Sequence, residues 1–114
     1  LTGDIDFELN QSEIREDAAI ELNKITSAMS KNKNINVFIG VHTDSRAPDN
    51  YNLTLSKERA QSIVTFIISK GINKKRLSAE GYGETKLLNG CSNGVKCSES
   101  EHLINRRIEF IVNE

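Results

Sequence analysis

The sequence predicts an α/β fold, a two-layer α/β sandwich in which helices pack on one face of a mixed β-sheet. Segments whose apolar residues alternate with period two are separated by segments with the three- and four-residue apolar spacing of helices, in the order β-α-β-α-β-(α)-β. The length of 114 residues suits one hydrophobic core. We therefore expect residues 1–114 to form a single domain.

The first half of the chain contains two expected strands and one helix. Residues 5 to 9 alternate apolar with acidic side chains, as a half-buried strand does. A helix is expected over about residues 12 to 30, with Asn10 or Ser12 as its N-cap. Its apolar face consists of Ile14, Ala18, Leu22, Ile25 and Met29. The next strand covers residues 34 to 41, with its apolar side made by Ile35, Val37, Ile39 and Val41.

The second half continues the alternation. Residues 45 to 50 form a loop that holds the single proline. The helix that follows has an apolar stripe and Gly71 as its C-terminal stop; the stripe consists of Ala60, Ile63, Val64, Ile67 and Ile68. Strands are expected at residues 77 to 83 and 106 to 112. In the first of these, Gly81 and Gly83 mark a strand end where the backbone needs conformational freedom.

The composition excludes several classes of function. Fifteen Lys and Arg against sixteen Asp and Glu give a formal net charge of -1, so there is no overall basic field to hold nucleic acid. No apolar run reaches the roughly 20 residues of a membrane-spanning helix. The sequence has neither a Gly-x-Ser-x-Gly turn nor a cysteine paired with a base. We expect a protein that is not an enzyme and uses no cofactor.

The most informative polar residues lie between His42 and Arg59. Asp44 follows the end of a strand, and Arg59 shares one helix face with Asn52 and Ser56 at spacings of four and seven residues. A carboxylate and a guanidinium across one cleft suit a zwitterionic amino-acid head group. The alternative is that Asp44 and Arg59 pair with each other or cap a loop. Spacing alone leaves both interpretations open.

A set of motifs then extends over nearly the whole chain. They are FELNQS at residues 7–12, HTD at 42–44, YNLTLSKERA at 51–60, GYGE at 81–84 and NRRIEF at 105–110. In their order and spacing they resemble the OmpA-like domain, the OmpA/Pal/MotB module that binds peptidoglycan in the envelope of Gram-negative bacteria. The β-α-β-α-β layout of that family agrees with the elements expected above.

The resemblance implies a ligand site for the diaminopimelate of the peptidoglycan stem peptide. By motif position, Asp44 and Arg59 would grip the carboxylate and ammonium at the free end of this residue. Asn52 would add amide hydrogen bonds, Leu53 an apolar wall, and Arg106 a second charged contact, because it shares strand parity with Ile108 and Phe110. Thr43 and Glu8 complete the expected set. Arg107 would be structural or solvent-facing.

The resemblance also implies a location and a parent protein. It indicates a periplasmic domain of an outer-membrane or envelope protein in a Gram-negative bacterium. The chain begins at Leu1 without an initiator methionine or signal peptide, so we expect a domain excised from a larger protein attached to the outer membrane. The motifs do not specify an oligomeric state.

Two departures from the family pattern support an alternative function. The family usually has glycine before His-Thr-Asp and again three residues after the aspartate, where this chain has Val41 and Ala47. If either position required positive φ, the loop would be rearranged. The alternative is an OmpA-fold module that interacts with proteins and does not bind peptidoglycan.

Cys91 and Cys97 are six residues apart in a glycine-containing loop, so a disulfide between them is sterically plausible. The oxidising periplasm that the resemblance implies favours this disulfide. A zinc site with these cysteines and His102 would need a fourth ligand that the sequence does not show.

Overall fold

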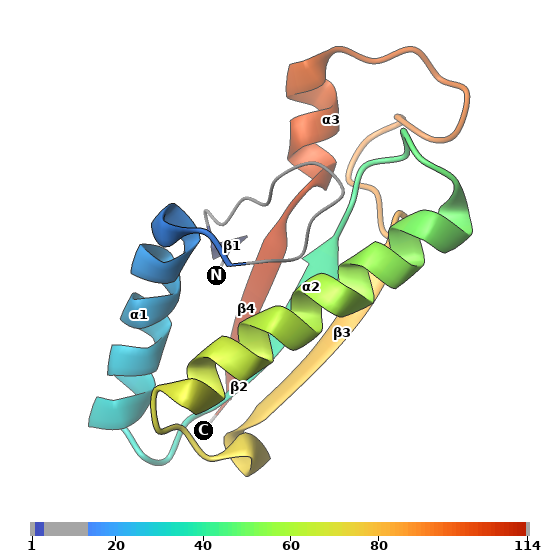
Figure 1. The fold of residues 1–114 in the computed structure, drawn as a ribbon. Coiled ribbons are helices and arrows are strands. Elements are labelled where there is room, and N and C mark those ends of the chain that lie inside the picture. Colours follow the sequence, from blue (N-terminus) through green and yellow to red (C-terminus); the bar gives the residue numbers. More distant parts are fainter. Residues whose placement is uncertain (1, 4–13, 114) are drawn as a thin grey trace.

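The computed structural model describes residues 2, 3 and 14–113. Its sheet has four strands in the order β1-β4-β2-β3 (Figure 1). These are β1 (Thr2–Gly3), β2 (Asn36–His42), β3 (Leu77–Gly83) and β4 (Ile108–Asn113). The strand expected at residues 5 to 9, the candidate N-caps Asn10 and Ser12, and Glu8 lie outside the described residues.

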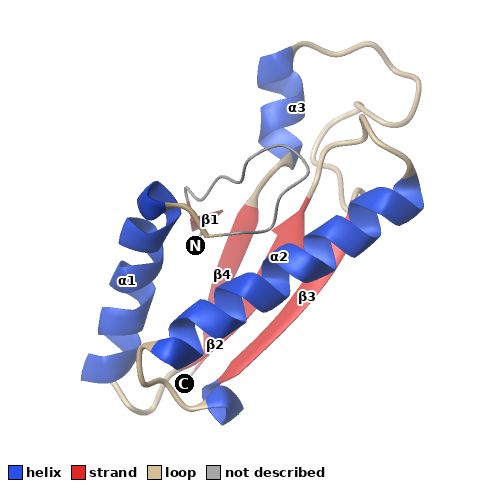
Figure 2. Ribbon diagram, viewed as in Figure 1, coloured by secondary structure: helices blue, strands red, loops and turns tan. Residues whose placement is uncertain are grey.

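The sheet is mixed, as the sequence predicts. β2 runs parallel to β3, and β4 runs antiparallel to both β2 and β1. Two long helices, α1 (Glu16–Lys31) and α2 (Asp49–Ser69), cover the same face of the sheet, as Figure 2 shows. A short helix, α3 (Glu99–Asn105), lies beyond the end of the sheet where β2 ends and β4 begins. The expected two-layer α/β sandwich is therefore confirmed.

The core lies between the sheet and the two long helices. Every apolar residue expected on the inner side of the second strand is buried, at 7% exposure or less. The helices contribute Ala18, Leu22 and Met29 from α1 and Ala60, Ile63 and Ile67 from α2. Burial of a side chain the size of isoleucine contributes about 1.5–3 kcal/mol. The predicted apolar stripes therefore hold both helices on the sheet.

Two expected boundaries differ from the structure. α1 begins at Glu16, after Arg15 in extended conformation. β4 begins at Ile108 and not at residue 106, because Arg106 is still the C-cap of α3 and its backbone N–H donates to the carbonyl of His102. Gly71 has a φ of +97° just after α2, which confirms it as the C-terminal stop.

α2 packs very closely on β3. Ser56 of α2 is fully buried, and its hydroxyl accepts a hydrogen bond from the backbone N–H of Gly83 at 2.9 Å. Gly83 has a φ of +58°, so the freedom expected for this residue is required. Gly81 is needed for a different reason: a Cβ there would lie 2.5 Å from the carbonyl carbon of Ser56. Close approach of two backbones explains this second glycine.

The long connection between β3 and β4 is cross-linked. Cys91 and Cys97 form the expected disulfide, so their thiols are not available as zinc ligands. Cys91 is 2% exposed, and its carbonyl accepts a hydrogen bond from the hydroxyl of Ser45. This connection is thereby attached to the loop that follows β2. Within the described ranges, no helix combines the length and apolarity needed to cross a membrane.

Candidate functional site

The candidate site lies at the end of the sheet where β2 ends, between the loop that leads to α2 and the short helix α3 (Figure 1). Thr43 and Asp44 follow β2 directly. The backbone N–H of Thr43 donates to the carbonyl of Gly83 at 2.8 Å. Its hydroxyl donates to the carbonyl of Asp44 at 3.0 Å. Thr43 is 5% exposed, so its internal contacts position the aspartate that follows.

Asp44 is a buried carboxylate enclosed by arginine. Its side chain is 10% exposed. Oδ1 accepts the backbone N–H of Arg46 at 3.0 Å, and Oδ2 accepts Nε and Nη2 of the same residue at 3.1 and 2.7 Å. Burial alone would raise the pKa of Asp44, but the hydrogen bonds and charge of Arg46, with the charge of Arg106, lower it. Asp44 is therefore ionised at neutral pH.

Arg46 and Arg106 both reach a second carboxylate, that of Glu99. Nη1 of Arg46 lies 2.6 Å from Oε2 of Glu99, and Nη2 of Arg106 donates to Oε1. Nε of Arg106 is 3.7 Å from Oδ2 of Asp44. Arg106 therefore lies beside Asp44 at the end of α3 and not in a strand, and its expected contact with the ligand stays a prediction.

Arg59 lies on α2, one turn after Ser56, and is half-buried. Asn52 and Ser56 are buried, at 4% and 0% exposure; the spacing predicts their shared helix face but not its burial. Within the described residues, the ion-pair partners of Asp44 are Arg46 and Arg106 and do not include Arg59, which has an interaction of its own. The alternative in which Asp44 and Arg59 pair with each other is not what the structure shows.

Asn52 organises the loop after β2. Its amide nitrogen lies 3.1 Å from the carbonyl oxygen of Asp44, 3.0 Å from that of Ala47 and 3.1 Å from Oε1 of Glu84. These bonds fix the loop that holds Asp44, and the expected hydrogen bonds from Asn52 to the ligand stay a prediction. Val41 is an ordinary core residue of β2, opposite Gly81 and Ile108. Valine at this position therefore requires no rearrangement of the loop.

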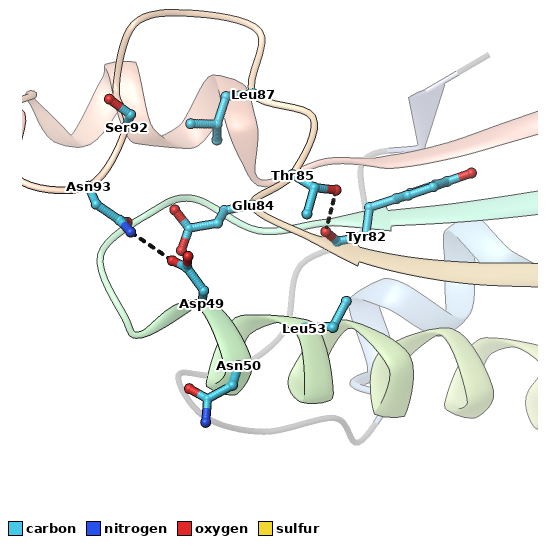
Figure 3. Close-up of a pocket in the computed structure, with 9 residues that line it drawn as sticks. All are labelled: Asp49, Asn50, Leu53, Tyr82, Glu84, Thr85, Leu87, Ser92 and Asn93. Carbon is cyan, nitrogen blue, oxygen red and sulfur yellow. Dashed lines mark hydrogen bonds between the residues drawn. The ribbon is translucent and has the colours of Figure 1, made fainter.

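Leu53 lines a separate pocket of about 430 Å³ (Figure 3). Its lining does not include Asp44, Arg59 or Arg106. The described lining residues are Asp49, Asn50, Leu53, Tyr82, Glu84, Thr85, Leu87, Ser92 and Asn93. The pocket lies beside the turn after β3, where the backbone of Leu53 approaches Gly83. The expected contact of Leu53 with the ligand stays a prediction.

Two members of the site were missed by sequence reasoning. Arg46 follows Asp44 by two residues, and the bond from its N–H to the Asp44 carboxylate is the Asx turn that aspartate commonly forms. That local signal could have identified Arg46. Glu99 is 53 positions from Arg46, and no sequence spacing indicates that they meet.

His42 lies on the sheet face opposite α2. It is 4% exposed and stacks on Tyr82, with ring centroids 4.9 Å apart. Its Nε2 is 2.6 Å from Oε1 of Glu109. Burial and then the charge of Arg107 lower the pKa of His42, Lys86 adds to this effect, and Glu109 opposes it. Arg107 is structural here, since its Nη2 donates to the carbonyl of Lys86 at 3.0 Å.

The lowered pKa of His42 predicts a loss of stability in mild acid. The unfolded chain, with a histidine pKa near 6.5, binds a proton at a higher pH than the folded chain does. The free energy of unfolding should therefore fall as pH decreases below about 6.5, by at most about 1.4 kcal/mol per pH unit. Urea unfolding between pH 7.5 and 5 should show this slope in the wild type and a weaker slope in His42→Gln. Equal slopes would contradict the assignment.

The chain is similar in sequence to several known proteins. A model of the OmpA family matches residues 6–100. The chain is 36% identical to Photosystem I P700 chlorophyll a apoprotein A2 of Gloeobacter violaceus, over 98% of the chain and 13% of that protein. It is 30% identical to outer membrane protein P5 of Haemophilus influenzae, over 99% of the chain and 33% of that protein. It therefore spans a third or less of the length of these two curated relatives.

The fold is also found among solved structures. The peptidoglycan-associated lipoprotein from Burkholderia pseudomallei superposes with a TM-score of 0.79 at 19% identity. The match covers 98% of this chain and 89% of that chain. At this identity, the likeness demonstrates the shared fold.

Proposed function

The chain belongs to the OmpA family, whose domains commonly bind peptidoglycan, and we propose that it binds peptidoglycan through the diaminopimelate of the stem peptide. Asp44 would accept the ammonium at the free end of this residue, and Arg59 would hold the carboxylate on the same carbon. The binding is non-catalytic. It would anchor a larger envelope protein to the cell wall.

One observation carries this proposal: Asp44 is ionised and buried at a strand end, in a loop held by Asn52. A buried carboxylate whose environment favours the charged form is suited to a cation, and charge-assisted hydrogen bonds to it are about twice as strong as neutral ones. The Asp44 and Arg59 positions match the family motif. A domain with these groups would recognise a zwitterion by both of its charges.

The location agrees with the relatives. Outer membrane protein P5 is among them, and a lipoprotein described as peptidoglycan-associated shares the fold. The chain is accordingly a periplasmic domain. Attachment of the parent protein to the outer membrane is part of the proposal.

The test is a calorimetric titration with two stem peptides that differ in one residue. The diaminopimelate peptide offers the zwitterion, whereas the lysine peptide lacks the second carboxylate and keeps the amine. Loss of one charge-assisted contact costs about 1.5–3 kcal/mol. We expect the lysine peptide to bind about 10- to 100-fold more weakly. Equal affinity for the two peptides would contradict recognition through Arg59.

A second candidate function is favoured by one specific contact. Both carboxylate oxygens of Asp44 already accept hydrogen bonds from Arg46, Oδ1 from its backbone N–H and Oδ2 from its guanidinium, so an ammonium must share Asp44 with Arg46. If Asp44 cannot accept both cations, the domain would be a protein-interaction module that keeps the fold without the wall ligand. A folded domain that binds neither stem peptide nor isolated peptidoglycan would favour this alternative.

A further inference from the structure

Glu99 is an exposed carboxylate held by two arginines that come from different parts of the chain. Its side chain is 63% exposed, yet each oxygen contacts a different guanidinium. Oε2 lies 2.6 Å from Nη1 of Arg46, in the loop after β2. Oε1 accepts from Nη2 of Arg106, at the end of α3. Together, Arg46 and Arg106 form a fork with the geometry of a carboxylate-binding site.

The fork is fixed on its inner side and open on its outer side. On the inner side, Arg46 donates twice to the buried carboxylate of Asp44, and Nε of Arg106 lies 3.7 Å from the same group. That Nε is itself buried and has no hydrogen-bond partner in the described part of the chain. Glu99 occupies the outer side, where solvent reaches it.

A free carboxylate could replace Glu99 without a change of fold. Exposed ion pairs contribute little to stability, because water screens them and the side chains lose entropy when they pair. Glu99 is not part of the capping box of α3, which Ser98 and Glu101 form. Release of Glu99 therefore leaves the helix start intact, and both arginines stay beside Asp44.

We infer that Arg46 and Arg106 form a second carboxylate subsite, which Glu99 fills until a carboxylate of the peptide ligand displaces it. The inference rests on the proposed function, and it extends that function from one zwitterionic head group to an acidic peptide with a further carboxylate. In a stem peptide that ends at diaminopimelate, the carboxylate at the chain terminus supplies this group. Glu99 is then an internal competitor that lowers the affinity for such peptides.

The test compares Glu99→Gln with Glu101→Gln. Both variants remove one exposed negative charge from α3, and glutamine at position 101 can still complete the capping box. Each is titrated with the diaminopimelate tripeptide and with the same tripeptide as its terminal amide. We expect Glu99→Gln to bind the free-carboxylate peptide about three- to tenfold more tightly than wild type does. The amide should show no such gain, and Glu101→Gln should behave as wild type does.

Several results would overturn the inference. These are an unchanged affinity in Glu99→Gln, an equal gain for the terminal amide, or the same gain in Glu101→Gln. If wild type binds the tripeptide in any of these cases, the proposed function stands while the second subsite fails.

A second measurement decides the question even if no tripeptide binds and the proposed function fails. Acetate is titrated into Glu99→Gln, and the Nε–Hε signals of Arg46 and Arg106 are followed by NMR. Saturable shifts of both signals would support the subsite if the shift of the Arg106 signal disappears in the double variant Arg46→Gln/Glu99→Gln. An absence of shifts in Glu99→Gln would refute it.

Discussion

Replacement of Arg59 by alanine should abolish binding to the diaminopimelate stem peptide while the domain stays folded. Arg59 lies at the edge of the buried stripe of α2, is half-buried and is not part of the apolar core, so we expect the core to persist in the variant. Removal of one partner of a charged, hydrogen-bonded contact costs roughly 2–5 kcal/mol, which is about 30- to several-thousand-fold in affinity. Calorimetric titration of the variant measures this loss.

The matched control for this change is Lys57→Ala. Lys57 is on the same helix two residues earlier, carries the same charge and is exposed, so it tests whether any lost positive charge weakens binding. We expect the control to bind within about twofold of wild type. Arg59→Lys should recover only part of the affinity, since an ammonium cannot form the two parallel bonds of a guanidinium.

Asp44→Asn tests the other half of the same contact, and it should affect stability as well. Asparagine keeps the shape but leaves Arg46 and Arg106 without their shared buried carboxylate. We expect a loss of about 1–3 kcal/mol in the free energy of unfolding together with the loss of binding. Binding must therefore be measured at a temperature where the variant is folded. If Asp44→Asn and Arg59→Ala both retained full affinity, the site assignment would be wrong.

The largest effect on stability is expected from Gly81→Ala. A Cβ at this position would lie 2.5 Å from the carbonyl carbon of Ser56 and 2.7 Å from the Cα of Lys57. Both are backbone atoms of α2, so no side-chain rotation can relieve the contact. The helix would have to move away from β3 and from the core that Ile63 and Ile67 complete. We expect a loss of at least about 3 kcal/mol and a melting temperature lower by more than about 10 °C.

Gly90→Ala is the control for this substitution. A Cβ at Gly90 would meet no atom within 4 Å, and Gly90 is not among the described glycines with positive φ. Its free energy of unfolding should stay within about 0.5 kcal/mol of wild type. Urea denaturation of both variants measures the difference. Equal stabilities would mean that α2 and β3 are not in the close contact described.

The periodic spacing of apolar residues predicted the two layers of this fold. The alternation over Ile35 to Val41 and the stripes of both long helices became the buried faces, because the core requires apolar side chains on one side of each element. The helix stop at Gly71 was also predictable, since its positive φ is a local backbone property. The sequence predicted the ends of helices and strands less accurately where contacts with a neighbouring element set those ends. At Arg106, the N–H bond to His102 continues α3 where strand parity alone predicted β4.

The candidate site was likewise predictable in part from the sequence. The sequence indicated Asp44, Arg59 and Arg106, because a motif fixes residue types at set spacings. It did not indicate that Asp44 bonds to Arg46, nor that Glu99 joins Arg46 to Arg106. The Asp44–Arg46 contact is local and an Asx turn could have indicated it. Arg46 and Glu99 are 53 positions apart along the chain, and no local pattern encodes their distance in space.

Leu53 and Gly81 show what only the tertiary structure decided. Leu53 lines the pocket beside the turn after β3 because α2 lies over that strand there. The need for glycine at 81 likewise comes from the distance between α2 and β3. The sequence by itself determined which apolar side chains are buried and which residues carry charge. The packing of α2 on the sheet decided which of them meet, because that distance and rotation depend on every contact in the interface at once.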